Sequence, residues 1–113
     1  MSKILYVDDD PKMIQLFSNY SRRLGIGIDV AISLEEASVM TSQKNYRLVI
    51  SDGLEGKWKD FYKSIESSFD GRFVVLSGTP EFKEDVNDLG FDFYAKPDDT
   101  PSVISLLIEY GKE

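Results

Sequence analysis

Short apolar runs alternate with longer periodic segments along the whole chain. A continuous apolar run such as Ile4-Leu5-Tyr6-Val7 is typical of a buried strand, whereas apolar residues spaced three and four apart indicate one face of a helix. The predicted strands cover residues 3–7, 28–32, 48–51, 72–76 and 91–95. The predicted helices cover residues 11–24, 34–44, 58–69, 81–89 and 101–110.

Polar residues mark where several of these helices begin. Asp10 fits the N-cap of the first helix, with Pro11 in the first turn, where its missing N–H costs nothing. Ser33 and Glu36 have the spacing of a capping box and open the second helix. Thr100, which precedes a proline, is the predicted N-cap of the last helix.

The regular alternation of strands and helices predicts an α/β fold. Apolar strands that alternate with helices form a parallel sheet with helices on both faces. A length of 113 residues suits one compact domain, and 42% apolar residues can supply an ordinary core. We therefore expect a single domain over residues 1–113.

Composition excludes several classes of chemistry. The chain has no cysteine and no histidine, which excludes disulfides, thiolate metal sites, imidazole bases and a role as the histidine donor of a phosphorelay. Its formal net charge of −7 makes nucleic acid and anionic membranes poor partners. No apolar run approaches the roughly 20 residues of a membrane span, and the first residues have no signal-peptide pattern. We expect a cytoplasmic protein.

Polar side chains collect where the predicted strands end. Asp8 and Asp9 follow the first strand, Asp52 the third, Ser77 the fourth and Lys96 the fifth. In a parallel α/β sheet, ligands bind beyond the carboxyl ends of the strands. All five side chains are therefore expected on one side of the molecule.

The chemistry of this set can be worked out from its functional groups. Three neighbouring carboxylates repel one another, and a hard divalent cation with oxygen ligands, such as Mg²⁺, relieves that repulsion. A carboxylate can attack phosphorus to give an acyl phosphate. Ser77 can donate a hydrogen bond to one phosphoryl oxygen, and Lys96 can pair with another.

Each motif alone has an ordinary structural explanation. The triplet at residues 8–10 is also typical of a solvated turn with an N-cap, Asp52-Gly53 of a turn, and Lys96-Pro97 of a loop. Only their combination, at four strand ends in this order, favours a functional site.

Four segments in this order resemble the receiver domains of two-component response regulators. They are ILYVDDDP at residues 4–11, LVISD at 48–52, VVLSG at 74–78 and FYAKP at 93–97. The likeness extends from Ile4 to the last helix. It implies a flavodoxin-like (βα)5 doubly wound fold, with a parallel five-stranded sheet in the strand order 2-1-3-4-5.

The resemblance also implies a metal site beside a phosphoacceptor. Asp52 matches the aspartate that accepts the phosphoryl group and also binds the metal. Asp9 matches a direct ligand of Mg²⁺ (or Mn²⁺), and Asp8 a ligand that acts largely through water. The backbone carbonyl of Leu54 completes the protein ligands.

A switch and its partners follow from the same resemblance. Ser77 matches the switch hydroxyl, Lys96 the lysine that contacts the phosphoryl group, and Phe93 the switch aromatic, although a core aromatic fits that position equally well. The phosphodonor would be a histidine kinase or phosphotransfer protein. A downstream protein target would bind the face formed by the fourth helix, fifth strand and fifth helix. The chain would be a regulatory phosphoacceptor that assists its own phosphorylation and slow dephosphorylation, not an enzyme with a separate substrate.

The chain departs from the receiver pattern in the loops around the site. Gly56 stands where receivers usually have proline, and Gly78 where alanine is commoner. Lys57 and Lys59 are unusual beside the acceptor and can either attract phosphate or be solvated. The stretch between Ser77 and Lys96 is short, so we expect a trimmed fourth helix.

Two alternatives remain open from the sequence. In a haloacid-dehalogenase-like phosphohydrolase, Asp8 would be the nucleophile and Asp10 the acid/base, but the chain is short for that class and Asp52 would have no role. The other alternative is a degenerate receiver that acts only as a phosphorylation-independent interaction module. The altered loop after Asp52 and the short fourth helix favour it, and the complete acidic set opposes it.

Overall fold

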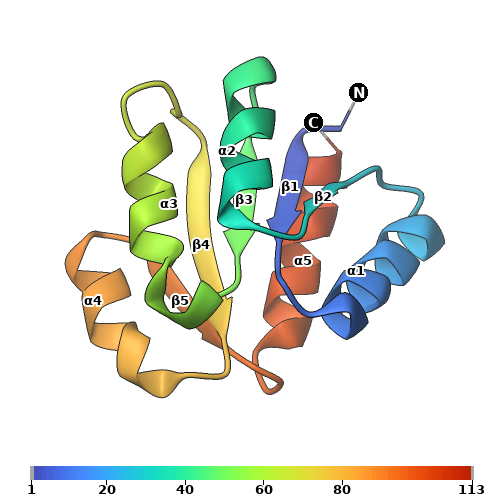
Figure 1. Cartoon of the computed structure of the whole chain (residues 1–113). Helices are drawn as coiled ribbons and strands as arrows, with labels where there is room; N and C mark the ends of the chain where they lie inside the picture. Colours follow the sequence, from blue (N-terminus) through green and yellow to red (C-terminus); the bar gives the residue numbers. More distant parts are fainter. Residues whose placement is uncertain (1, 113) are drawn as a thin grey trace.

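Five strands form one parallel sheet in the computed structural model, which describes residues 2–112. The order is β2-β1-β3-β4-β5, which confirms the predicted flavodoxin-like α/β topology. In Figure 1 the strands run side by side toward one edge of the sheet, opposite the edge near the chain termini. The strands are β1 (Ile4–Val7), β2 (Asp29–Ala31), β3 (Leu48–Ser51), β4 (Arg72–Ser77) and β5 (Asp92–Ala95).

Helices cover both faces of this sheet, as predicted. Side chains of α2, α3 and α4 pack on one face, and those of α1 and α5 on the other. The helices are α1 (Pro11–Leu24), α2 (Leu34–Gln43), α3 (Trp58–Ile65), α4 (Lys83–Asp88) and α5 (Thr100–Gly111), with short 3₁₀ turns η1 (Leu54–Gly56) and η2 (Pro80–Phe82). None of the helices within residues 2–112 is long and apolar enough to cross a membrane.

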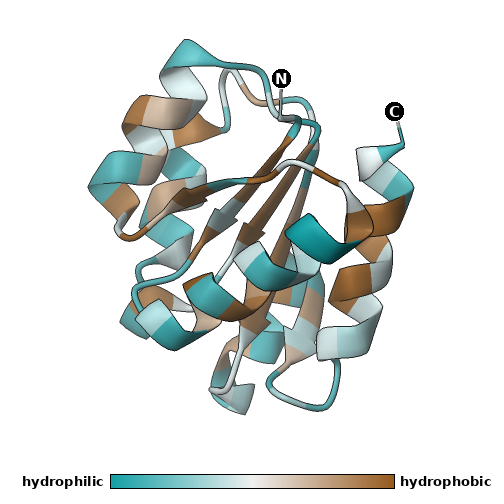
Figure 2. Cartoon of the chain, turned by 90° about the vertical axis from the view of Figure 1, so that its right-hand side faces the viewer, coloured by the Kyte–Doolittle hydropathy of each residue, from teal (hydrophilic) through white to brown (hydrophobic). Residues whose placement is uncertain are grey.

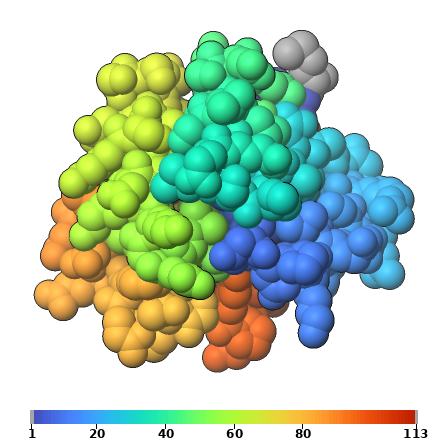
Figure 3. Space-filling view, in the orientation of Figure 1, coloured from blue at the N-terminus to red at the C-terminus, as the bar shows by residue number. Residues whose placement is uncertain are grey.

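Because helices cover both faces of the sheet, both sides of each central strand are buried, which explains the continuous apolar runs. In β1, Leu5 and Val7 face α2 and α3, whereas Ile4 and Tyr6 face α1 and α5, and all four are buried. Figure 2 shows brown, apolar strands enclosed between helices whose ribbons alternate between teal and brown. Figure 3 shows that side chains of α2 and α3 hide the sheet from that side.

Two predicted helix starts are confirmed in atomic detail. The Asp10 side chain accepts a hydrogen bond from the Lys12 N–H at 2.9 Å. The Ser33 hydroxyl accepts one from the Glu36 N–H at 3.1 Å, and the Glu36 carboxylate accepts the Ile32 N–H, one residue before the predicted partner. These bonds satisfy N–H groups that a helix leaves without partners at its start.

The third helix ends earlier than predicted, at Ile65 instead of residue 69. The Ser64 hydroxyl donates to the Phe61 carbonyl at 2.6 Å, and the Ser68 hydroxyl donates to the Ile65 carbonyl at 3.4 Å. Serine side chains that bond the backbone in this way compete with helix continuation. The limits of β3 are as predicted; those of β1, β4 and β5 differ by one residue at one end, and those of β2 by one residue at both ends.

The last two helices also differ from their predicted limits. Residues 81–89 divide into η2 and a regular α4 of only Lys83–Asp88, which confirms the trimmed fourth helix. The predicted N-cap Thr100 is wrong, because Thr100 is already helical and Asp99 is the N-cap. The Asp99 carbonyl accepts the Val103 N–H, so the first helical hydrogen bond begins one residue earlier than expected.

Candidate functional site

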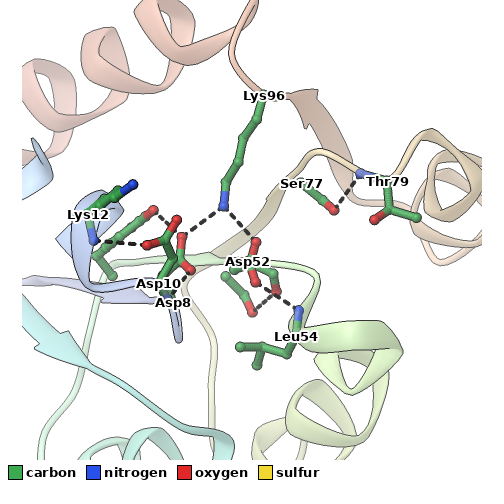
Figure 4. A network of polar contacts seen from close by, with 10 residues as sticks. Asp8, Asp10, Lys12, Asp52, Leu54, Ser77, Thr79 and Lys96 are labelled. Carbon is green, nitrogen blue, oxygen red and sulfur yellow. Dashed lines mark hydrogen bonds and ion pairs between the residues drawn. The ribbon is translucent and has the colours of Figure 1, made fainter.

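The carboxylates predicted to form the site lie together at the carboxyl edge of the sheet. β1 pairs with β3 in the register Val7↔Ser51, so Asp8 and Asp52 leave the sheet next to each other. Oxygen atoms of Asp8, Asp9 and Asp52 all lie within 4.8 Å of one another. Figure 4 shows Asp8 and Asp52 turned toward a common point.

These carboxylates differ in their contact with solvent. Asp8 is fully buried, Asp9 is exposed, and the Asp52 side chain retains 15% of its surface. Asp10 is exposed and serves as the N-cap of α1. Asp9 and Asp52 therefore offer accessible oxygen atoms, whereas Asp8 belongs to the buried floor of the site.

Lys96 links the two less exposed carboxylates. Its Nζ donates to Asp52 Oδ1 at 2.7 Å and to Asp8 Oδ2 at 2.9 Å (Figure 4). The Lys96 side chain is 18% exposed. Burial lowers the pKa of the ammonium, but the hydrogen bonds to Asp52 and Asp8 outweigh burial and raise the pKa of Lys96 above its ordinary value. Lys96 is therefore the charged partner that holds this acidic group together.

Asp8 has a further partner that is absent from the predicted set. The Tyr6 hydroxyl donates to Asp8 Oδ2 at 2.7 Å, and the Asp10 N–H donates to Asp8 Oδ1 at 3.0 Å. Burial, then the hydrogen bond and charge of Asp8 and the charge of Asp52, raise the pKa of Tyr6. Tyr6 lies in an apolar run, but residues two apart on a strand share a face, and that spacing was the available signal.

The loop after Asp52 has an unusual backbone. The Leu54 N–H donates to Asp52 Oδ2 at 3.0 Å. Leu54, Glu55 and Gly56 have positive φ values of 50°, 56° and 92°, a conformation that glycine adopts easily and other residues rarely do. The Leu54 carbonyl, the predicted metal ligand, accepts the Lys57 N–H at 3.0 Å and keeps a second lone pair.

Gly53 lets the loop after Asp52 approach the loop after β4. A Cβ atom at this position would lie 2.7 Å from the Ser77 hydroxyl oxygen and 2.7 Å from the Phe82 ring. Both contacts are closer than real Cβ atoms make, so any side chain here would displace its neighbours. Neither Gly53 nor Phe82 is among the residues predicted to matter at the site.

The predicted switch residues occupy the same end of the molecule. Ser77 is buried, and its hydroxyl accepts the Thr79 N–H at 3.0 Å (Figure 4). Phe93 is partly buried and packs against the core cluster under α2, α3 and α4. The structure therefore places Ser77 beside the Asp52 loop and Phe93 within packed apolar surroundings, and their switching roles remain predictions.

Lys57 and Lys59, in the segment after Asp52, have different surroundings. Lys59 pairs with Asp85 at 3.3 Å, and both side chains are largely exposed. Lys57 lines a cavity of about 180 Å³ beside the acidic group, together with Asp9 and Leu54. Lys57 is thus the one placed next to the predicted site.

The donor set fits a hard divalent cation. Three carboxylates meet one ammonium group, which leaves two negative charges uncompensated among these groups. Their atoms are oxygen, which suits Mg²⁺, and the exposure of Asp9 leaves room for retained waters. Asp9 and Asp52 are the more accessible of these ligands, whereas Asp8 and Leu54, whose carbonyl is the predicted fourth ligand, are buried.

The geometry disfavours the phosphohydrolase alternative. Its nucleophile would be Asp8, but only 1% of that side chain is exposed, and Tyr6, Lys96 and Asp10 all donate to its two oxygens. Its acid/base would be Asp10, which is occupied as a helix N-cap. Asp52, by contrast, has the more accessible carboxylate.

No protein-family model and no curated protein sequence matches the chain. Solved structures do match over nearly its whole length. Response regulator TrrA of Thermotoga maritima, solved in complex with Mg²⁺ and BeF, has 26% identity and a TM-score of 0.75, and the match covers 95% of this chain and 99% of that one. The receiver domain of Francisella response regulator 1452 has 23% identity and a TM-score of 0.75, covering 96% and 98%.

A designed protein of the Rossmann 2x3 type also matches, with a TM-score of 0.80 at 18% identity, covering 98% of this chain and 93% of its own. This match shows a shared fold and says nothing about function, because backbone similarity alone does not identify an activity. The chain has the fold of response regulator receiver domains, which confirms the resemblance predicted from the sequence. The acidic group of Asp8, Asp9 and Asp52 is compatible with a phosphoacceptor of that class.

Proposed function

We propose that this chain is a phosphoacceptor receiver domain in which Asp52 accepts a phosphoryl group with Mg²⁺ bound beside it. The observation that carries the proposal is the arrangement of Asp8, Asp9 and Asp52 within 4.8 Å, with Lys96 bonded to two of them. Asp52 is the acceptor because its carboxylate is accessible and held by the Leu54 N–H.

Phosphoryl transfer follows from these groups. A carboxylate oxygen of Asp52 forms a bond to phosphorus while the bond from phosphorus to the donor atom breaks. From a phosphohistidine the imidazole nitrogen leaves with the electron pair and takes up a proton, and from acetyl phosphate the leaving group is acetate. Mg²⁺, when bound, neutralises negative charge on the phosphoryl oxygens and the carboxylates. Asp9, Asp52 and the Leu54 carbonyl would hold it, with Asp8 acting through water.

The signal would arise because the new phosphoryl group changes the partners of nearby side chains. Lys96 would exchange its bonds to Asp52 and Asp8 for a bond to a phosphoryl oxygen, and the Ser77 hydroxyl, which accepts the Thr79 N–H, would donate to another phosphoryl oxygen. Phe93 would then repack, altering the face of α4, β5 and α5 that a protein target binds. The regular part of α4 on this face is only Lys83–Asp88.

The proposed phosphodonor and the slow loss of the phosphoryl group both follow from the composition of the chain. A histidine kinase or phosphotransfer protein would supply the phosphoryl group, since the chain contains no histidine. The chain would act as a regulatory phosphoprotein whose acyl phosphate hydrolyses slowly, since no imidazole base is present.

Intact-mass spectrometry after incubation with acetyl phosphate and Mg²⁺ tests the proposal. We expect one phosphate adduct on the wild type, its loss in Asp52→Asn, and its retention in Asp60→Asn, which changes an exposed aspartate of α3. No adduct on the wild type, with no Mg²⁺ binding in a parallel titration, would support the interaction module instead. Steady phosphate release that Asp8→Asn abolishes would support the phosphohydrolase.

A further inference from the structure

A buried hydroxyl group reaches the acidic site from inside the core. Tyr6 has no exposed surface, and its ring stacks on Phe17 with 4.1 Å between ring centroids. The ring belongs to the core cluster under α1 and α5, but the hydroxyl lies 2.7 Å from Asp8 Oδ2. A phenylalanine would serve the packing equally well, so packing does not account for the hydroxyl.

The Asp8 carboxylate has its hydrogen-bonding capacity nearly filled. Oδ2 accepts from both Tyr6 and Lys96, and Oδ1 accepts the Asp10 N–H. A carboxylate oxygen offers about two lone-pair sites, so a single site on Oδ1 remains for water or a metal. Tyr6 and Lys96 together therefore fix which oxygen of Asp8 faces outward.

The shared oxygen creates a problem when Lys96 moves. In the proposed function, Lys96 turns from the carboxylates to the phosphoryl group, which would remove one donor from Oδ2 of a carboxylate that is 1% exposed. A buried charged oxygen without a donor is strongly disfavoured. The hydroxyl of Tyr6 is the donor that stays, since its ring is locked in the core.

We propose that Tyr6 is a positioning residue of the acidic site. Its hydroxyl orients Asp8 toward the metal and keeps Asp8 Oδ2 hydrogen-bonded when Lys96 leaves. This inference rests on the proposed function for the movement of Lys96, but the bond itself belongs to the resting structure. Tyr6 does not contact the phosphoryl group and acts through Asp8 alone.

The chain contains a matched control for this hydroxyl. Tyr46 is 3% exposed, and its hydroxyl donates to Asp29 Oδ2 at 2.7 Å, the same bond length to the same type of group. Asp29 has no part in the acidic group of Asp8. Tyr46→Phe therefore removes a tyrosine–aspartate bond of the same length, to a partly exposed aspartate, without touching the site.

The first test is a thermodynamic cycle on metal-free protein. Unfolding equilibria would be measured for wild type, Tyr6→Phe, Lys96→Met and the double variant. Without Lys96, loss of the Tyr6 hydroxyl leaves Asp8 Oδ2 with no donor, so we expect Tyr6→Phe to reduce the folding equilibrium constant about tenfold more in the Lys96→Met background. Tyr46→Phe should combine with Lys96→Met additively. Additivity of Tyr6→Phe with Lys96→Met within twofold would overturn the proposal.

The second test uses Mg²⁺ alone and needs only the single variants. Calorimetric titration should give a dissociation constant raised about fivefold to tenfold by Tyr6→Phe and changed less than twofold by Tyr46→Phe, because only the first removes a hydrogen bond that orients the Asp8 carboxylate. An unchanged Mg²⁺ affinity in Tyr6→Phe would refute the positioning role. Neither test requires phosphorylation, so absence of a phosphate adduct on the wild type would reject the proposed function and leave these results interpretable.

Discussion

Two aspartates in this molecule have nearly identical partners and different surroundings. Asp29 Oδ2 accepts hydrogen bonds from Lys44 Nζ at 2.8 Å and from the Tyr46 hydroxyl at 2.7 Å. Asp8 Oδ2 likewise accepts from one lysine and one tyrosine, at 2.9 Å and 2.7 Å. Local bonding therefore does not distinguish the two positions.

Charge distinguishes them. At Asp29 one carboxylate meets one ammonium group, so the pair is balanced, and it lies at the start of β2. Beyond the end of β1, three carboxylates lie together, and the Lys96 ammonium group pairs with two of them, Asp8 and Asp52. Asp29, Lys44 and Tyr46 form a charge-balanced structural group, called the clamp below. The group of three carboxylates would instead gain stability from a further cation. Excess negative charge, and not the presence of an ion pair, distinguishes the candidate site from the Asp29 pair.

Substituting Lys96 and Lys44 in turn should give the largest difference between the two sites. In the proposed function, Lys96→Met removes the positive charge that would meet the transferred phosphoryl group, and we expect the rate of phosphorylation by acetyl phosphate to fall about 100-fold or more. Lys44→Met should leave that rate unchanged and cost about 1 kcal/mol of unfolding free energy, because its ion pair is partly exposed. Both rates can be followed by intact-mass spectrometry. Equal rates in the two variants would contradict the assigned role of Lys96.

Removing each carboxylate should separate metal binding from stability. With Mg²⁺ at about 100 times its dissociation constant, wild type should gain about 2.7 kcal/mol of unfolding free energy. Asp8→Asn should lose most of that gain, because it removes one of the neighbouring carboxylates whose repulsion a bound Mg²⁺ would relieve. Asp29→Asn should keep the gain but be less stable at every Mg²⁺ concentration, since two donors lose a charged acceptor. Urea titrations with and without Mg²⁺ measure both effects.

The difference between the two aspartates could be predicted from the sequence only in part. Asp8, Asp9, Asp52 and Lys96 were predicted to converge because parallel strands bring their carboxyl ends to one edge, and topology follows from the alternation of elements. The clamp at Asp29 was not predicted, because its partners come from 15 and 17 residues away and no motif connects them.

Features that depend on side-chain orientation could also not be predicted from the pattern of apolar and polar residues. Tyr6 has the same place in an apolar run whether its hydroxyl is bonded or not. The closeness of Phe82 to Gly53 depends on how η2 folds back over the acceptor loop. The end of α3 and the N-cap of α5 were misplaced because serine hydroxyls and the Asp99 carbonyl decided them.

The acidic site also depends on the close approach of the Gly53 backbone to the side chains of Ser77 and Phe82. Gly53→Ala would place a Cβ atom 2.7 Å from both Ser77 and Phe82, and we expect a loss of about 1–3 kcal/mol in unfolding free energy together with slower phosphorylation. Gly78→Ala is the matched control, because its Cβ would meet nothing closer than Lys96 Cβ at 4.0 Å. Thermal unfolding of both variants measures the effect. A tolerated Gly53→Ala would show that Phe82 moves aside freely.

The smallest expected effect concerns the pH dependence of the clamp. Burial raises the pKa of Asp29, but the hydrogen bonds from Lys44 and Tyr46 outweigh burial and lower the pKa below its ordinary value of 3.8. A carboxylate with a lowered pKa in the folded state adds stability above its unfolded pKa, and that stability disappears as the pH falls through the folded value. The stability difference between wild type and Asp29→Asn should therefore be constant from pH 7 to about pH 5 and shrink below 3.8. Urea unfolding of both proteins at each pH measures it. A difference that is unchanged at the lowest pH would mean that Asp29 contributes through packing and not through its charge.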